Sequence, residues 1–187
     1  MGGGEVAARK AQSLLDAGAR VTVIAPVVVP QLENVDGIAI FSRSYKSGDV
    51  IGFALVFAAT DDRSINAIVF DEASKQNIPV NVVDDPELCS FIVPSVIRRG
   101  DLMIAISSSG KSPSLCKKIR KELEEQYGEE YADFVDLLGE LRPVVKAKYL
   151  SQSDREAVFA KLLNVGILEL LCEGKKEEAR KRALECI

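Results

Sequence analysis

The sequence of 187 residues contains no histidine. Histidine is the side chain that most often serves as a general acid or base near neutral pH, and it is the commonest protein ligand of metal ions. Its absence excludes catalytic triads built on histidine and the common histidine-based zinc chemistry. Any acid–base chemistry must therefore fall to Asp, Glu, Lys, Tyr or Cys.

Cysteine is scarce and widely spaced. The four cysteines form no C-x-x-C pair, and they stand at positions 89, 116, 172 and 186. This spacing indicates neither a structural zinc site nor a disulfide framework. We expect four reduced thiols, most of them in packing, and no metal site.

The sequence also lacks an apolar run of membrane-spanning length, and it does not open with the basic and apolar segments of a secretory signal. Its net charge of -4 provides no basic field for nucleic acid. The composition, 47% hydrophobic and 28% charged, is that of an ordinary globular protein. We expect a cytoplasmic protein without a membrane or nucleic-acid partner, with one good core and a small second domain.

The most informative residues that are present open the chain. Gly2, Gly4 and Ala7 fit the spacing G-x-G-x-x-A of a dinucleotide-binding loop. In such a loop the first glycine forms a tight turn, the second lets the backbone approach a pyrophosphate, and the small third residue lets a helix pack close to the sheet. The N-terminus of the following helix then binds the phosphates. A flexible glycine leader is the alternative interpretation.

The residues that follow alternate between helical and strand patterns, which is typical of an α/β fold. Gly18 is expected to end the first helix as its C-terminal cap, and Arg9 and Lys10 are expected to face outward. The strands should be parallel because short helices connect them. We predict helices over 5–17 and 63–76, and strands over 20–25, 38–41, 53–59 and 78–83.

The strand that should precede the glycine loop is not in the sequence, which starts at the loop itself. That strand is central in a dinucleotide-binding sheet. We therefore expect either a gap in the sheet or a sheet in which the strands on either side of that position are forced together. We also expect residues 1–187 to bind NAD poorly, because the entry to the loop is not anchored on the sheet.

Two of the predicted strands end in paired carboxylates, within residues 60–62 and 84–86. Ligands of open α/β sheets bind at this carboxyl edge. Asp85 precedes proline and is held extended, so Asp84 is the better candidate to face the cleft. Helix capping by Asp62 and a polar turn at residues 84–86 are the alternative explanations.

The first predicted strand ends Ala25-Pro26-Val27, without the acidic residue that often binds the ribose hydroxyls at this point. The preference between NAD and NADP therefore stays open. A backbone contact or Gln31 is a possible substitute for the acidic residue.

The pattern changes after residue 90. Two strands, 90–98 and 102–107, are joined at hairpin spacing, and the segment 107–113 (S-S-S-G-K-S-P) follows them. Ser112 suits the cap of a helix that begins at Pro113. The hydroxyl and backbone donors of this segment form a fair anion site.

The remainder is predicted to be helical, and Pro143 should break or kink its second helix. We place the helices at about 114–127, 129–149, 154–163, 165–172 and 175–186. The charge-laced last helix indicates a solvated face rather than a binding patch.

In their order and spacing these motifs resemble the precorrin-2 dehydrogenase / sirohydrochlorin ferrochelatase family, which includes the front part of sirohaem synthase. The resemblance runs in register from Gly2 to about Leu123, and the helical tail matches only in length and character. It rests on the segments G-G-G-E-V-A-A-R-K, L-L-D-A-G-A-R-V-T-V-I-A-P, Arg43-x-Tyr45 with Gly48-Asp49, A-A-T-D-D with Asn66, N-V-V-D-D-P, F-I-V-P-S and I-S-S-S-G-K-S-P-S-L.

The resemblance implies a Rossmann-type NAD-binding domain over 1–89, a small antiparallel dimerisation module over 90–113 and a helical domain over 114–187, working as a homodimer. It implies oxidation of precorrin-2 to sirohydrochlorin in sirohaem biosynthesis, with hydride passing to NAD. Ferrochelatase activity on sirohydrochlorin is one alternative, and a dinucleotide sensor without catalysis is another. The sequence does not decide whether the chain also inserts iron.

The resemblance also implies roles for individual residues. The catalytic one is Asp84, as proton acceptor or shuttle. The cofactor-binding residues are Gly2, Gly3, Gly4, Glu5, Val6, Pro26, Val27, Ala59 and Thr60. The residues for the tetrapyrrole polyanion are Ser108, Ser109, Lys111, Arg98 and Arg99. Lys117, Lys118 and Arg120 add positive charge nearby in the sequence. We expect about half of these six basic residues to contribute to substrate binding.

Overall fold

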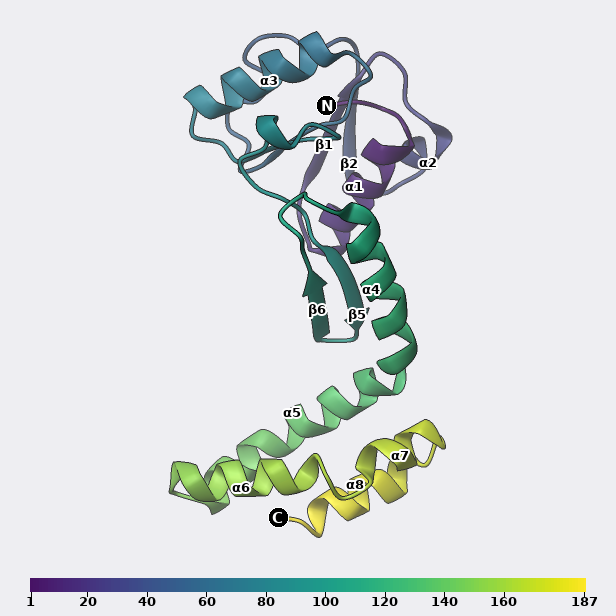
Figure 1. Ribbon diagram of the computed structural model, residues 1–187, viewed down its shortest axis with the longest axis vertical. Coiled ribbons are helices and arrows are strands. Elements are labelled where there is room, and N and C mark those ends of the chain that lie inside the picture. The colour runs from purple at the N-terminus through teal and green to yellow at the C-terminus, as the bar shows by residue number, and fades with distance from the viewer. The chain divides into compact units, whose positions relative to one another are not determined.

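Alternating apolar patterns in the first half of the chain produce the expected α/β architecture. The computed structural model describes residues 1–187, which divide into unit 1 (Met1–Val93) and unit 2 (Pro94–Ile187) (Figure 1). In chain order, unit 1 contains α1 (Glu5–Asp16), β1 (Val21–Ala25), α2 (Pro30–Glu33), β2 (Ile38–Ser42), β3 (Val56–Ala58), α3 (Arg63–Lys75), β4 (Val80–Val82) and the 3₁₀ helix η1 (Pro86–Leu88).

The strands of unit 1 pair in parallel, as the short connecting helices predict. β1 pairs with β2 from Val21 opposite Ile38 to Ala25 opposite Ser42. β3 pairs with β4 from Val56 opposite Val80 through the length of both strands. The α/β class is therefore confirmed, and its carboxyl edge carries the polar segments that the sequence places after each strand.

No strand lies between β1 and β3, so the expected gap in the sheet is present. Met1 and Gly2 bridge its carboxyl end and anchor the entry to the glycine loop on β1 and β3, so the reason for expecting poor NAD binding was wrong. The Met1 amino group donates to the Phe57 carbonyl at 2.7 Å, and the Met1 carbonyl accepts from the Ala59 N–H at 2.8 Å. On the other side, the Gly2 N–H donates to the Ile24 carbonyl at 3.1 Å. Burial lowers the pKa of the Met1 amino group to about 6.

A cavity of about 90 Å³ lies between β1 and β3, and two details of the structure there differ from the prediction. Lys10 does not face outward: its amine lies 5.6 Å from the centre of the Phe57 ring, and burial, with a smaller effect of Arg9, lowers the pKa of Lys10. The third strand is shorter than predicted, because Phe53 and Leu55 line the cavity and residues 53–55 have no neighbouring strand to pair with.

Two apolar clusters support unit 1. One joins α3 to β3 and β4 through Val50, Val56, Ala58, Val69, Ala73, Val80 and Val82. The other joins α1 to β1 and α2 through Ala11, Val21, Val23 and Leu32. Each cluster belongs to one pair of strands, so the bridging residues at the glycine loop lie where the two halves of the unit meet.

Unit 2 begins with the predicted antiparallel hairpin and continues as helices. β5 (Ser95–Arg99) pairs with β6 (Leu102–Ile106), and Gly100 takes a positive φ of 55° in the turn. The helices are α4 (Pro113–Gln126), α5 (Glu130–Lys148), α6 (Gln152–Leu162), α7 (Ile167–Cys172) and α8 (Lys176–Leu184). None of the helices is both long enough and apolar enough to cross a membrane.

Helix α5 continues through Pro143, so of the predicted break or kink the break does not occur. Proline removes the hydrogen bond to the carbonyl four residues earlier. That carbonyl belongs to Gly139, an exposed residue, so water can replace the missing donor. Leu141 and Val145, on either side of the proline, are buried in the helical core and hold the helix in place.

The helical core provides a direct stability test. Leu162 and Leu163 are neighbours, but Leu162 is 0% exposed and Leu163 is 58% exposed. Leu162→Ala should lower the free energy of unfolding by about 2–5 kcal/mol, because it removes buried methyl groups and leaves a cavity.

Urea unfolding followed by circular dichroism measures this difference. Leu163→Ala serves as the matched control and should shift the free energy of unfolding by less than about 0.5 kcal/mol. Equal losses for the two variants would contradict the placement of Leu162 in the core.

Candidate functional site

The three glycines at the start of unit 1 have different structural tasks. Gly2 has a φ of 106°, and a Cβ there would lie 2.2 Å from the Ala59 carbonyl oxygen. A Cβ on Gly3 would lie 2.0 Å from the carbonyl oxygen of Val27. Gly4 precedes α1 as its N-cap, and a Cβ there would meet nothing within 4 Å. The first two glycines are thus required by the protein backbone, whereas Gly4 faces open space.

That open space is part of a pocket of about 630 Å³, the glycine-loop pocket. All nine residues that the sequence assigns to cofactor binding lie in its lining. Further lining residues come from after the first two strands and from the start of α3, and they include Val28, Val29, Ser44, Tyr45 and Ile65. Sequence reasoning did not assign these to the cofactor, although their positions just beyond the carboxyl ends of parallel strands could have indicated them.

The N-terminus of α1 borders the glycine-loop pocket. The first helical turn has unpaired N–H groups and the positive end of the helix dipole, which attract anions. Glu5 lies in this turn, and Gln31 donates a hydrogen bond from Nε2 to its Oε1 at 3.0 Å. Gln31, considered as a ribose contact, therefore has its amide group engaged with Glu5.

The segment after β3 is held by side chains of α3. Asn66, 6% exposed, donates from Nδ2 to the Thr60 carbonyl at 2.9 Å and accepts from the Thr60 hydroxyl at 2.8 Å. Asp62 caps α3 by accepting from the N–H groups of Ser64 and Ile65. Capping thus explains Asp62 but not Asp61, which makes no capping contact and lines the glycine-loop pocket.

A second pocket, the carboxylate pocket, has a volume of about 480 Å³ and contains Asp84. It shares four lining residues with the glycine-loop pocket: Val6, Ala59, Thr60 and Asp61. The rest of its lining is Arg63, Asn66, Val82, Val83, Asp84 and Asp85. The two pockets are therefore contiguous at the carboxyl edge of unit 1.

The turn after β4 separates the roles of its two carboxylates. Asp85 pairs with Arg63 at 3.1 Å, whereas Asp84 is exposed and has no ion pair. Asp84 has a φ of 59°, a left-handed conformation that Asp and Asn tolerate better than most residues. The Cys89 thiol donates to the Asp85 carbonyl at 3.2 Å, while its sulfur accepts from the Val82 N–H at 3.2 Å. These contacts hold the turn.

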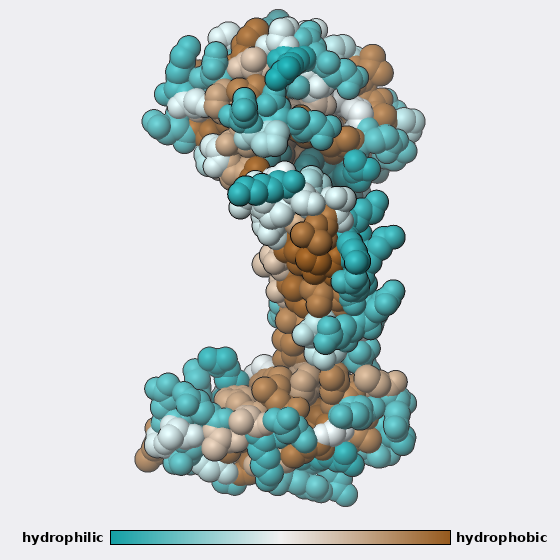
Figure 2. Space-filling view, viewed as in Figure 1, coloured by the Kyte–Doolittle hydropathy of each residue, from teal (hydrophilic) through white to brown (hydrophobic).

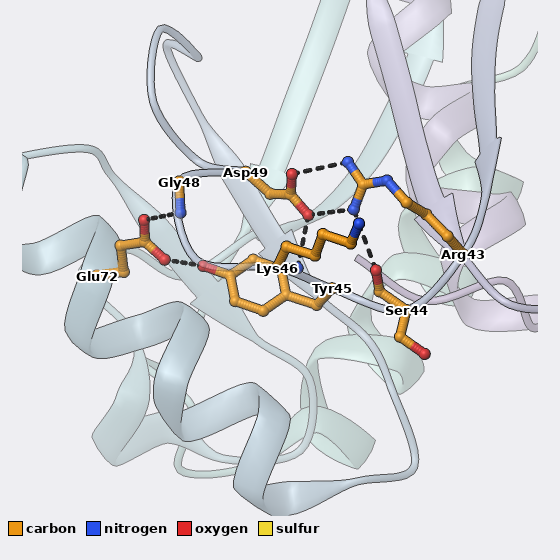
Figure 3. Close-up of polar contacts among 7 residues, drawn as sticks. All are labelled: Arg43, Ser44, Tyr45, Lys46, Gly48, Asp49 and Glu72. Carbon is orange, nitrogen blue, oxygen red and sulfur yellow. Dashed lines mark hydrogen bonds and ion pairs between the residues drawn. The ribbon is translucent and has the colours of Figure 1, made fainter.

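The segment from Arg43 to Asp49 forms another part of the site, and Figure 3 shows its polar contacts. Arg43 binds Asp49 through both terminal nitrogens, at 2.6 and 2.8 Å. This pairing, led by the hydrogen bond, lowers the pKa of Asp49 and raises that of Arg43. The Tyr45 hydroxyl donates to Glu72 on α3, and burial together with this carboxylate raises the pKa of Tyr45.

The serine-rich loop lies in unit 2, between β6 and α4. The Ser108 hydroxyl accepts from the Ser112 N–H at 2.9 Å, and the Ser109 N–H donates to the Ser107 hydroxyl at 3.1 Å. Ser112 caps α4 by accepting from the Leu115 N–H at 3.4 Å, as predicted. Ser109 has a positive φ of 52°, and Lys111 is exposed.

The basic residues of unit 2 fall into two groups. Arg99 donates from Nε to the Tyr127 carbonyl at 2.8 Å and pairs with Glu129 at 3.3 Å. It therefore anchors the end of α4, which sequence reasoning did not foresee. Lys118 and Arg120 also pair, with acidic residues one turn further along α4. Arg98, Lys111 and Lys117 are exposed and have no ion pair.

Three family models match the chain in succession. The first is described as putative NAD(P)-binding and covers residues 1–95. The second, the central region of a sirohaem biosynthesis protein, covers residues 99–126. The third, the dimerisation region of sirohaem synthase, covers residues 130–186.

Individual proteins show the same likeness. The chain is 41% identical over 190 residues to siroheme synthase 1 of Aeromonas salmonicida, which covers 98% of the chain and 40% of that protein. It is 41% identical over 184 residues to a siroheme synthase of Ectopseudomonas mendocina, covering 97% of the chain and 39% of that protein. The chain thus spans about two fifths of the length of these relatives.

A solved structure shares the fold. The precorrin-2 dehydrogenase SirC matches with a TM-score of 0.79 and 24% identity, over 98% of this chain and 92% of the other. At that identity the match establishes the architecture: the α/β unit, the small antiparallel sheet and the helical region.

The different tasks of the glycines can be separated by substitution. Gly3→Ala should lower the melting temperature by several degrees, because its Cβ would collide with the Val27 backbone. Overpacking of this kind costs roughly 1–3 kcal/mol of folding free energy. Gly4→Ala should leave the melting temperature nearly unchanged, because its Cβ enters open space and its φ of -85° suits alanine.

Differential scanning calorimetry of both variants measures the contrast. NAD should raise the melting temperature of Gly4→Ala less than that of the parent, because the added methyl group would occupy space that a pyrophosphate needs. A destabilised Gly4→Ala protein, or a fully stable Gly3→Ala protein, would contradict this division of tasks.

The cap of α3 makes a pH-dependent prediction. A hydrogen bond from the Ser64 hydroxyl, followed by the Ile65 and Ser64 N–H groups, holds the pKa of Asp62 below its ordinary value. A carboxylate of lowered pKa stabilises the fold above its unfolded pKa, near pH 4, and this contribution is lost as the pH falls through the folded pKa.

Asp62→Ala should therefore lower the melting temperature at about pH 7, and its difference from the parent should shrink at about pH 3. Thermal scans at both values measure the difference. Asp61→Ala is the control: it lacks the capping contacts, and its difference from the parent should be small at both pH values.

Proposed function

The chain belongs to the family of sirohaem biosynthesis proteins with a putative NAD(P)-binding domain, and we propose that it catalyses the NAD-dependent dehydrogenation of precorrin-2 to sirohydrochlorin. One observation carries the proposal: the glycine-loop pocket and the carboxylate pocket share a wall of four residues. A dinucleotide on the glycine loop would therefore reach the neighbourhood of Asp84. The names of the siroheme synthases and of SirC support the choice of substrate.

The residues of the glycine-loop pocket fit a dinucleotide. Gly4 leaves open space at the N-terminus of α1, where the backbone N–H groups would bind the pyrophosphate. Pro26 and Val27, just after β1, and Ala59 and Thr60, just after β3, also line the pocket. When bound, NAD accepts the hydride that leaves the substrate.

Asp84 is the residue to which we assign the accompanying proton. Dehydrogenation removes a hydride and a proton, and the carboxylate pocket contains no Lys, Tyr or Cys beside its aspartates to take the proton. Asp84 lines the carboxylate pocket and has no ion pair, whereas Asp85 is engaged with Arg63. Asp84 is thus available as a proton acceptor or shuttle.

For the substrate we propose contacts from unit 2. Precorrin-2 carries several carboxylates, which bind to cations and to hydroxyl and N–H donors. The serine-rich loop offers Ser108, Ser109 and Lys111, and Arg98 is exposed on β5. Arg99 also belongs to the proposed set, although its guanidinium already donates to the carbonyls of Glu124 in α4 and of Tyr127 just after it.

We also propose a homodimer. Residues 130–186 match the dimerisation region of sirohaem synthase, and the hairpin of unit 2 exposes apolar side chains. Figure 2 shows hydrophobic surface over β5 and β6, where Met103 is 54% exposed. Apolar area of this kind is typical of surfaces that associate.

The test of the function is turnover by the Asp84 variant. Asp84→Asn keeps the left-handed backbone, since Asn also tolerates this conformation. It should lower NAD-dependent turnover of precorrin-2 by roughly 10²–10⁴-fold, the range for loss of a general base. NAD affinity should change by less than about twofold, because Asp84 does not line the glycine-loop pocket.

NADH absorbance reports turnover, and a fluorescence titration reports NAD affinity. Asp36→Asn, an exposed residue of unit 1 outside both pockets, is the control and should match the parent. No NADH formation by the parent would reject the proposed dehydrogenase. Normal turnover by Asp84→Asn would remove that residue from the mechanism.

A further inference from the structure

We propose that Glu72 is a positioning residue for the dinucleotide: from α3 it holds the segment Arg43–Asp49, and through it the side chains of Ser44 and Tyr45 in the lining of the glycine-loop pocket. We call residues 43–49 the wall segment. The inference rests on the proposed function insofar as the ligand of the pocket is a dinucleotide. The placement of the wall segment by Glu72 does not depend on the ligand.

The two carboxylate oxygens of Glu72 bind two different points of the wall segment. Oε2 accepts from the Tyr45 hydroxyl, and Oε1 accepts from the Gly48 N–H (Figure 3). Gly48 has a φ of 97°, a conformation that favours glycine. These bonds join α3 to residues more than twenty positions earlier in the sequence.

Asp49 holds the wall segment internally. Besides the two bonds from Arg43, its Oδ2 accepts from the Lys46 N–H at 2.7 Å. Arg43 also donates to the Ser44 carbonyl at 3.0 Å. The segment is therefore closed on itself by Asp49, and Glu72 attaches the closed segment to α3.

The attachment matters for the pocket because of where Tyr45 lies. Tyr45 packs beside Ile65 against the core of β3, β4 and α3, and both residues line the glycine-loop pocket. Its hydroxyl is bound to Glu72, so it offers its ring rather than its oxygen to a ligand. Without Glu72 the phenol would lose its acceptor, and the wall segment would have no polar bond to α3.

Glu72 is distinct from its neighbours on α3. Asp71 is exposed and makes no side-chain hydrogen bond or ion pair, whereas Glu72 is half-buried and accepts from two donors. Hydrogen bonds to a charged acceptor are stronger than those between neutral groups. Asp71→Ala therefore provides a control with the same change of charge on the same helix.

The test combines NAD affinity with hydrogen exchange. Glu72→Ala should weaken NAD binding about tenfold, which corresponds to the loss of one net charge-assisted hydrogen bond. It should raise the KM for NAD more than it lowers kcat. Glu72→Gln, which keeps one acceptor oxygen, should recover part of the affinity, and Asp71→Ala should bind as the parent does.

A double-mutant cycle separates positioning from a general loss of stability. Tyr45→Phe should cost part of the affinity lost in Glu72→Ala, and the double variant should bind no more weakly than Glu72→Ala alone, because the hydroxyl acts only through Glu72. Strictly additive losses, or equal losses in Asp71→Ala, would overturn the proposal.

Exchange of the Gly48 amide hydrogen supplies a readout without ligand. It should be protected in the parent and in Asp71→Ala, and should exchange much faster in Glu72→Ala. Unchanged exchange in Glu72→Ala would overturn the positioning role even if NAD binds. Failure of the parent to bind NAD, with the exchange difference intact, would instead reject the proposed function.

Discussion

The close approach of the backbone at Gly2 and Gly3 is the constraint on which the rest of unit 1 depends. Here the glycine loop is wedged between the carbonyl groups of Val27 and Ala59, at distances that no side chain permits. The two parallel pairs of strands share no ladder of hydrogen bonds, so this loop joins them at the carboxyl edge. The same contact directs the N-terminus of α1 toward the pocket.

The acidic residues around that edge divide their tasks in a consistent way. In each of the two Asp-Asp pairs one carboxylate is engaged, Asp62 by the cap of α3 and Asp85 by Arg63. All four carboxylates line one of the pockets, but Asp61 and Asp84 make neither a capping contact nor an ion pair. Structural carboxylates thereby place the turns, and the neighbouring carboxylates are left available for chemistry at the edge of the sheet.

Much of the fold could be predicted from local patterns. The strand from Val21 to Ala25, the cap at Ser112 and the antiparallel hairpin follow from β-branched runs, capping chemistry and turn spacing. Predictions failed where a distant partner decided the outcome. Residues 53–55 have strand composition but no neighbouring strand, and Lys10 lies over the Phe57 ring, which no helical pattern reveals.

The sequence by itself determined the chemistry that is open to this protein: no histidine, glycines at a dinucleotide spacing, and carboxylates at the ends of buried strands. These features are local, since residue type and spacing along the chain define them. Only the tertiary structure decided that the glycine-loop and carboxylate pockets share a wall, and that Glu72 binds Tyr45 and Gly48. Such contacts join residues far apart in the chain, and they depend on how helices and strands pack rather than on any periodicity.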